Sequence, residues 1–241
     1  MPLGLSLLWW LASEHEWVAP QVLPTPAAVL AALHETVVSG ELWVHLQISF
    51  WRVLGGFSLG LAAGLVLGVG MGLSPTFKDY VYPSFKAMVQ VPVLGWLPLL
   101  MLLVGIDEAL KVILIAKAAL VPVAMNTLKG IENVPPRYLE VARVLQYSRW
   151  QLLRHVIFPA ALGPIWTGLR YGLTHAWLAL VVVELLASSE GLGFMLVYGR
   201  QLFQLDLVFA AVLVVGAVGY CLDHLLARVE TRLSRWRREA F

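Results

Sequence analysis

The chain has 241 residues, of which 59% are hydrophobic and only 13% are charged, and its formal net charge is +2. Soluble domains contain about a quarter charged residues, so this composition excludes an ordinary soluble domain, and the small net charge argues against a nucleic-acid partner. Apolar windows long enough to cross a bilayer recur, and they lack the polar–apolar alternation of barrel strands. The sequence therefore predicts an all-α, polytopic membrane helical bundle.

The common signatures of chemistry are missing from the sequence. Cys221 is the single cysteine and lies within an apolar run, which excludes an intrachain disulfide and a Cys-rich metal site. Neither a GxxxxGK[ST] phosphate loop nor an HExxH motif occurs. We therefore expect no catalytic residues, no cofactor and no metal site, and we expect that this chain alone is not an enzyme.

The first residues predict two short helices outside the main spans. The opening MPLGLSLLWWLAS has an apolar run of about ten residues, which reaches roughly 15 Å as a helix, half of a bilayer core. It lacks the basic start of a signal peptide, so we interpret it as a short first helix. Residues 14–48 are amphipathic rather than spanning, and Thr25-Pro26 has the residue types that begin a surface helix.

Five membrane spans are predicted further along the chain, and about six if the short first helix is counted. They cover residues 49–73, 81–104, 109–127, 162–187 and 207–227. The second span is broken by Pro92, Gly95 and Pro98. In the first span, small residues at positions 56, 60, 64, 68 and 72 line one helix face, which we interpret as a surface for close helix packing.

The distribution of lysine and arginine predicts the orientation of these spans. Residues 14–48 contain neither, and the connections 105–111 and 188–206 contain one each. The other side carries Lys78, Lys129, Arg137, Arg143, Arg149, Arg154 and five arginines between positions 228 and 238. By the positive-inside rule the loop at about 128–160 and the C-terminus are cytoplasmic in a multi-pass membrane protein.

The cytoplasmic loop at 128–160 is much longer than a connection between two spans requires. Pro135-Pro136 favours a first helix from about 136 to 145. Ser148 followed by Gln151 fits a capping box, which predicts a second helix that begins at 147–149 and ends at Pro159. The loop therefore forms either a docking piece or an interfacial helix on anionic lipid, which its arginines favour.

This loop resembles the EAA loop of ABC-importer permeases, whose pattern is E-A-A-x3-G-x9-I-x-L-P. The matching positions are Glu140, Val141, Ala142, Gln146, Val156, Phe158 and Pro159. Gln146 stands where the family usually has glycine, and Val141 where it has alanine. The similarity extends from LPTPAAVLAAL through GELWVHLQISFWRVLGGFSLG to VELLASSEGLGFM, and it resembles the permeases for aliphatic sulfonate, taurine and nitrate uptake.

The resemblance implies the type I ABC importer fold, with residues 1–241 as a single permease domain in the bacterial inner membrane. It implies that a periplasmic solute-binding protein delivers a small anion, a sulfonate, taurine or nitrate, and that cytoplasmic ATP-binding subunits hydrolyse ATP. A second copy of the permease and membrane lipid complete the expected partners, with no nucleic acid among them. The residues expected to couple to the ATPase are Tyr138, Glu140, Ala142, Arg143, Gln146 and Pro159.

Two other functional classes remain open on the residues alone. A secondary transporter would usually show inverted repeats and mid-span proton or sodium carboxylates, and neither is clear in this sequence. An intramembrane enzyme would need a paired catalytic constellation, which is also missing. The ATP-driven importer is therefore the preferred interpretation, and a secondary transporter without an ATPase partner is the alternative.

Polar residues within the spans are the candidates for the substrate pathway or its gate, because charges in a membrane are costly. Lys117 lies mid-span, and it either favours an anionic substrate or pairs with Glu184. His175 either bonds a neighbouring helix or relays a proton. Gln90, Pro92 and Trp96 belong to the broken span, where irregular backbone lines a wet cavity or forms a packing kink.

Overall fold

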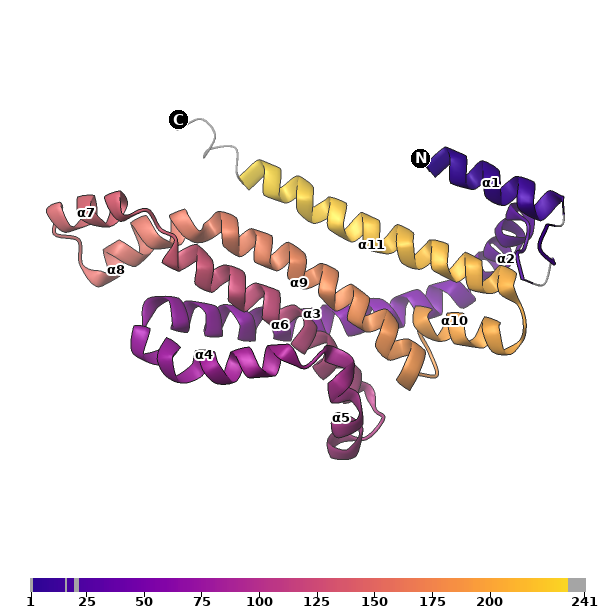
Figure 1. Cartoon of the computed structure of the whole chain (residues 1–241), viewed down its shortest axis with the longest axis horizontal. Coiled ribbons are helices and arrows are strands. Elements are labelled where there is room, and N and C mark those ends of the chain that lie inside the picture. Colours follow the sequence, from indigo (N-terminus) through magenta and orange to yellow (C-terminus); the bar gives the residue numbers. More distant parts are fainter. Residues whose placement is uncertain (1, 16, 20–21, 234–241) are drawn as a thin grey trace. The chain divides into compact units, whose positions relative to one another are not determined.

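The computed structural model of the protein describes residues 2–15, 17–19 and 22–233, and every regular element among them is a helix (Figure 1). In chain order these are α1 (Pro2–Glu14), α2 (Pro26–Val38), α3 (Glu41–Leu73), α4 (Pro75–Gln90), the 3-10 turn η1 (Val93–Trp96), α5 (Leu97–Val104), α6 (Glu108–Glu132), α7 (Pro136–Val144), α8 (Arg149–Leu152), the π-helical turn η2 (Leu153–Ile157), α9 (Phe158–Ala187), α10 (Leu192–Gln201) and α11 (Leu205–Leu233). The predicted all-α class is confirmed.

The chain folds into two compact units that share three long helices. The first unit comprises Met1–Arg52 and Leu180–Tyr220, and the second comprises Val53–Ala179 and Cys221–Phe241. Helices α3, α9 and α11 each contribute residues to both units.

In the first unit, the two short N-terminal helices form as the sequence predicts. The Thr25 hydroxyl caps α2 by accepting a hydrogen bond of 3.2 Å from the Ala28 N–H, and Pro26 occupies the first turn. Trp9 of α1 stacks on Phe209 with ring centroids 5.8 Å apart, and its indole N–H donates to the Pro24 carbonyl. These contacts hold α1 on its own unit, and α1 is not among the helices long enough to cross a membrane.

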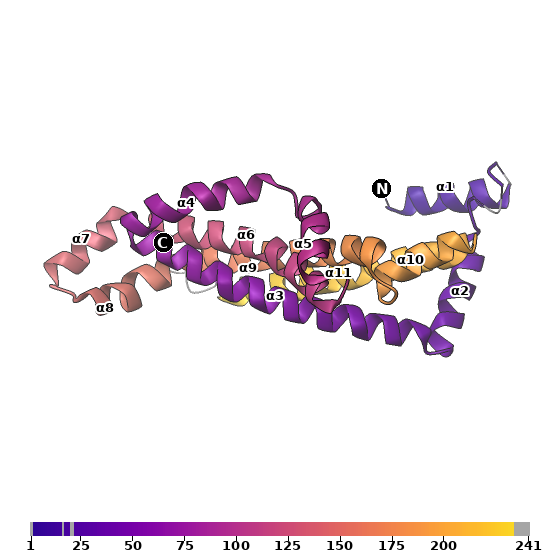
Figure 2. The same cartoon turned by 90° about the horizontal axis from the view of Figure 1, so that it is seen from below.

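Among the described residues, three helical stretches are long and apolar enough to cross a membrane: Glu41–Leu73, Arg149–Ala187 and Leu205–Thr231. A fourth crossing results if α4 and Val93–Val104, which meet at 95°, count as one broken span (Figure 2). The predicted break at Pro92 is thus confirmed. Proline lacks an N–H for the helix and disfavours helical geometry at the residue before it, Val91, whose backbone is extended.

The predicted span 109–127 lies within α6, which is not one of these candidate spans and is a core helix of the second unit. A methyl group added at Gly60 or Gly64 of α3 would lie 2.8 Å from the Cβ atom of Ala119 or Val123 of α6. The stripe of small residues therefore lets the two backbones approach closely, as the packing interpretation predicted.

Helix α4 packs beside the ends of α3 and α6 in the same unit (Figures 1 and 2). Met71, Phe85, Ala124 and Leu128 form a buried cluster between these three helices. At their polar end, the Lys78 ammonium lies 2.5 Å from the Glu132 carboxylate. This ion pair therefore holds the end of α6 in place, and the next loop begins there.

Candidate functional site

The long loop after α6 folds into a helical elbow, defined here as residues 136–159. Its two helices begin where the sequence predicts them: α7 at Pro136 and α8 at Arg149. The Ser148 hydroxyl accepts from the Gln151 N–H at 3.3 Å, and the Gln151 side-chain oxygen accepts from the Ser148 N–H at 2.8 Å. The predicted capping box is therefore confirmed, and it fixes the start of the second helix.

The corner of the elbow requires left-handed backbone at Gln146, whose φ is +53°. The Tyr147 N–H donates to the Ala142 carbonyl and the Gln146 N–H donates to the Arg143 carbonyl, both at 3.0 Å. These two bonds form a Schellman motif, in which glycine is the usual left-handed residue. The departure of Gln146 from glycine therefore leaves the corner intact but places a side chain on strained backbone.

The elbow presents a different face of α7 from the one that the motif suggested. Ala142 is only 3% exposed, so its side chain is buried within the chain and does not face outward. The exposed apolar residues are Val141, Val144 and Leu145, and Val144 is 82% exposed. Their spacing of three and four residues places them on one face of the helix turn, a signal that was present in the sequence. Reasoning from the motif alone missed them.

The other predicted coupling residues on α7 and its corner are exposed, namely Tyr138, Glu140, Arg143 and Gln146. They surround the exposed apolar face without covering it. We call Val141, Val144 and Leu145 with these four residues the elbow surface.

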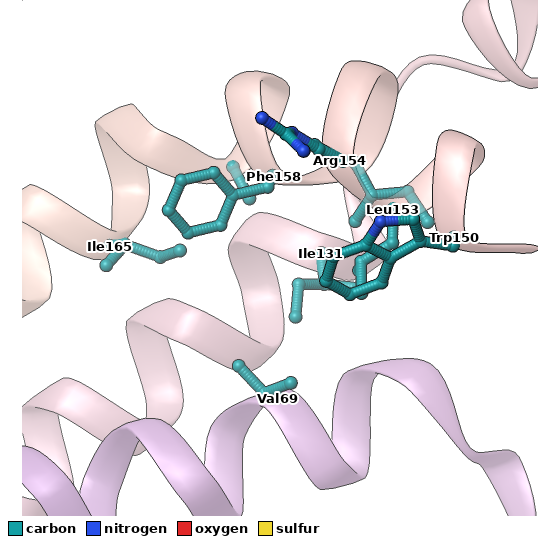
Figure 3. A pocket seen from close by; sticks show the side chains of 9 residues that line it. Val69, Ile131, Trp150, Leu153, Arg154, Phe158 and Ile165 are labelled. Atoms are coloured by element: carbon teal, nitrogen blue, oxygen red, sulfur yellow. The ribbon is translucent and has the colours of Figure 1, made fainter.

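The elbow rests on an apolar cavity of about 310 Å³, seen in Figure 3. Val69 of α3 and Ile131 of α6 line its floor, and Trp150 and Leu153 cover Ile131 from the elbow side. The remaining lining residues are Arg154, Ile157, Phe158, Ala161 and Ile165. The elbow therefore meets the two helices beneath it through apolar side chains.

The sequence predicted that the second helix of the elbow ends at Pro159. In the structure the helix instead continues into α9. Helical structure runs without a gap from Arg149 to Ala187. Pro159 cannot donate a hydrogen bond to the carbonyl four residues earlier, and the wide π-turn Leu153–Ile157 lies directly before it. A local change of helix type thus accommodates the proline. One continuous helix, called the helical rod below, leads from the elbow toward a membrane span.

The broken span brings two of the candidate pathway residues, Lys117 and Trp96, together in the second unit. The Lys117 ammonium donates to the Val91 carbonyl at 3.0 Å, and it lies 5.3 Å from the centre of the Trp96 ring. Pro92 precedes the turn η1 that carries Trp96, and Gln90 ends α4 with an exposed side chain. Sequence reasoning selected these residues but missed the Val91 carbonyl, which becomes available because the helix stops there.

Glu184 has a different partner from the one that the sequence suggested. In the first unit its carboxylate lies 2.9 Å from the Arg52 guanidinium, and it also accepts from the Ser49 hydroxyl at 2.8 Å. It further accepts from the Gly193 N–H at 2.9 Å and is fully buried. Within its own unit Glu184 is therefore paired with Arg52, and the Lys117 pairing considered from the sequence is not needed to balance its charge. Arg52, an arginine inside a predicted span, was the missed signal.

The same cluster shapes the turn before α10. The Arg52 guanidinium donates to the Glu190 carbonyl at 2.8 Å, and the His45 ring accepts from the Gly191 N–H at 2.9 Å. A side chain at Gly191 would overlap the Glu184 carboxylate. Glu184 thus positions this turn from the interior of the unit.

On α9 in the second unit, His175 is exposed and its Nδ1 lies 2.8 Å from the carbonyl of Tyr171 in its own helix. The predicted bond to a neighbouring helix is therefore not the one that forms. One helix turn away, Arg170 binds Asp223 of α11 through two hydrogen bonds of 2.7 and 2.9 Å, and Glu230 through one of 3.3 Å. This network fastens α9 to α11 within that unit.

Comparisons with known proteins agree with this arrangement. Residues 60–235 match the family described as binding-protein-dependent transport system inner membrane component. An aliphatic sulfonates transport permease of Bacillus subtilis is 40% identical over 98% of this chain and 86% of its own length. A taurine transport system permease of Escherichia coli is 35% identical over 98% of this chain and 87% of its own. A nitrate import permease of Synechocystis is 32% identical over 87% of this chain and 79% of its own.

The fold also matches a solved transporter structure. An inward-facing structure of the MetNI methionine ABC transporter aligns with a TM-score of 0.59 over 82% of this chain and 96% of that chain. At 17% identity this likeness concerns the fold alone, and it confirms the expected importer fold.

Proposed function

The chain belongs to the family of inner membrane components of binding-protein-dependent transport systems, and from that premise we propose that it imports a small anion, a sulfonate, taurine or nitrate. The observation that carries the proposal is the similarity, over nearly the whole chain, to permeases named for these solutes. A binding protein on the outer side delivers the anion. ATP is hydrolysed on separate cytoplasmic subunits, so the permease itself is not the enzyme.

The transporter contains two copies of this permease, with the loop at 128–160 and the C-terminus in the cytoplasm. Among the described residues of each copy, three or four helical stretches can cross a membrane, which is few for enclosing a polar pathway. Large apolar side chains remain exposed along α3 and α11 in each copy, for example Trp51 and Tyr220. A second copy and lipid together cover such surfaces.

The elbow surface couples the permease to the ATP-binding subunit. Its exposed valines and leucine give an apolar contact, and Glu140 and Arg143 offer charges around it. Ala142 contributes from inside, because its small side chain lets α7 pack within the elbow. Pro159 lies in the continuous helical rod, which transmits movement of the elbow to the span at 162–187.

The anion passes near the break of the second predicted span. Gln90, Pro92, Trp96 and Lys117 are at or beside that break, and irregular backbone in a membrane occurs where it faces protein or a wet cavity. His175, which is exposed on α9, also contributes to this pathway as a polar residue of its wall. Glu184 acts indirectly, by holding the turn before α10.

One experiment tests the importer against a secondary transporter. The permease is expressed with its ATP-binding subunit, purified and placed in proteoliposomes with a solute-loaded binding protein. We expect the ATP-binding subunit to copurify, and uptake of labelled ethanesulfonate, taurine or nitrate to require ATP. Uptake that needs only a proton or sodium gradient would support the secondary transporter, and the pairing of Glu184 with Arg52 and Asp223 with Arg170 already argues against it.

A further inference from the structure

Lys117 carries a positive charge, and the group that it contacts within this membrane protein is not an anion. Its described contacts are the Val91 carbonyl at 3.0 Å and the face of the Trp96 ring. Among the described residues of the second unit, no carboxylate lies within ion-pairing distance of this ammonium. The other mid-span charges, Glu184 and Arg170, both have partners of opposite sign. Lys117 is therefore set apart from them.

A second donor lies beside this ammonium. The indole N–H of Trp96 is buried, and no described residue accepts a hydrogen bond from it. A buried donor without an acceptor costs free energy, so this N–H calls for an acceptor that the described residues do not supply. The ring of the same tryptophan stands 5.3 Å from the Lys117 ammonium. One ligand with several oxygen acceptors would satisfy both groups.

We propose that Lys117 and Trp96 form an anion subsite for the head group of the transported solute, an inference that rests on the proposed import of a small oxyanion. The ammonium has three N–H donors, and one is directed at Val91, which leaves two for the ligand. The indole N–H adds a donor from a neighbouring position. A sulfonate or nitrate group offers several oxygens on one atom and can accept from both residues at once.

The break in the helix is what makes the subsite possible. In an unbroken helix the Val91 carbonyl would accept from a backbone N–H four residues later, whereas here it holds the ammonium of Lys117. The 95° bend brings Trp96 next to α6. Because the ammonium is anchored on a neutral carbonyl rather than a carboxylate, its charge stays available to the anion, and release remains easy.

Three variants test the two donors separately in the reconstituted transporter with its ATP-binding subunit and loaded binding protein. Lys117→Gln removes the charge, Lys117→Arg keeps it, and Trp96→Phe removes only the indole N–H. Lys86→Gln is the matched control, because Lys86 is an exposed lysine on α4. The measurements are initial uptake of labelled ethanesulfonate, taurine and nitrate, ATP hydrolysis stimulated by the binding protein, and the melting temperature of the complex.

We expect Lys117→Gln to lower anion uptake about tenfold or more. Trp96→Phe should lower it by roughly two- to tenfold, because a hydrogen bond that involves a charged group contributes more free energy than one between neutral groups. Lys117→Arg and Lys86→Gln should retain most uptake. The melting temperature should stay near wild type in all four variants, and stimulated ATP hydrolysis should stay near wild type in Lys86→Gln, which lies outside the subsite.

Two results separate the failure of the subsite from that of the transport function. If wild type imports one of these anions while Lys117→Gln and Trp96→Phe match it, the subsite is wrong and the function stands. If wild type imports none of the three, the proposed substrate class is wrong, and the subsite falls with it. Loss of uptake in Lys117→Gln that follows a fall in melting temperature, with Trp96→Phe unaffected, would identify a structural lysine and overturn the subsite.

Discussion

Single residues in this chain show how a motif can be kept while one of its members changes. Gln146 replaces the glycine of the EAA pattern, yet its backbone adopts the left-handed conformation that glycine supplies, with φ at +53°. The two hydrogen bonds of the Schellman motif outweigh the strain. The sequence predicts a corner here, but only the backbone shows that the corner survives the substitution.

Replacing Gln146 with glycine should relieve this strain. We expect Gln146→Gly to stabilise the elbow by roughly 1 kcal/mol, because the left-handed region is costly for residues with a Cβ atom. Gln146→Val should have the opposite sign, since a β-branched residue fits that region poorly. Hydrogen–deuterium exchange of the α7 amides measures both changes. Equal exchange in the two variants would show that the corner is not strained.

The buried ion pair of the first unit should contribute strongly to stability. Glu184→Gln should lower the free energy of unfolding by about 3–5 kcal/mol, because it removes the anion that faces a buried guanidinium. Adding Arg52→Met in the same protein should restore part of the loss. The melting temperature of the purified permease in detergent gives the comparison. Lys117→Gln serves as the control, and a comparable fall in that variant would contradict the assignment of partners.

At the scale of helices, the elbow and the rod behind it form one mechanical element. α7 contributes an exposed apolar face, the capping box of Ser148 fixes the start of α8, and the helix then runs on to Ala187. The sequence predicts the two helices of the elbow from proline and capping signals. It does not show which side of α7 is buried, because Ala142 and Val144 are both apolar and only packing distinguishes them.

This burial pattern gives distinct outcomes for two neighbouring positions. Val144→Glu places a charge on a side chain that is 82% exposed, so the elbow should fold normally while an apolar contact with the ATP-binding subunit loses several kcal/mol. We expect copurification of that subunit to be lost at normal membrane levels of the permease.

Ala142→Glu should act differently, because that position is buried within the chain. We expect this variant to disrupt the elbow itself, with faster amide exchange in α7 and loss of the ATP-binding subunit. Val144→Ile is the matched control and should bind as wild type does. If Val144→Glu copurifies and stimulates ATP hydrolysis normally, the elbow surface is not the contact.

At the scale of the whole molecule, the excess of lysine and arginine in the 128–160 loop predicts which side of the membrane the elbow faces. A cysteine at exposed Glu35 should react with a membrane-impermeant thiol reagent in right-side-out vesicles, in a Cys221→Ser background. A cysteine at exposed Arg143 should react only after the membrane is permeabilised. Reversed labelling would place the elbow outside and remove its role in coupling to a cytoplasmic ATPase.

Hydropathy, proline positions and capping residues act locally along the chain, so they are enough to predict the class of this protein. The break at Pro92, the start of α2 at Pro26 and the capping box at Ser148 are all of this kind. Tertiary structure decided which partner each charge meets and which face each helix buries. Arg52 and Glu184 are 132 residues apart in the chain, and the sequence suggested Lys117 as the partner of Glu184 instead. Ion pairing depends on distance in space, and only the folded helices bring a guanidinium rather than an ammonium to that carboxylate.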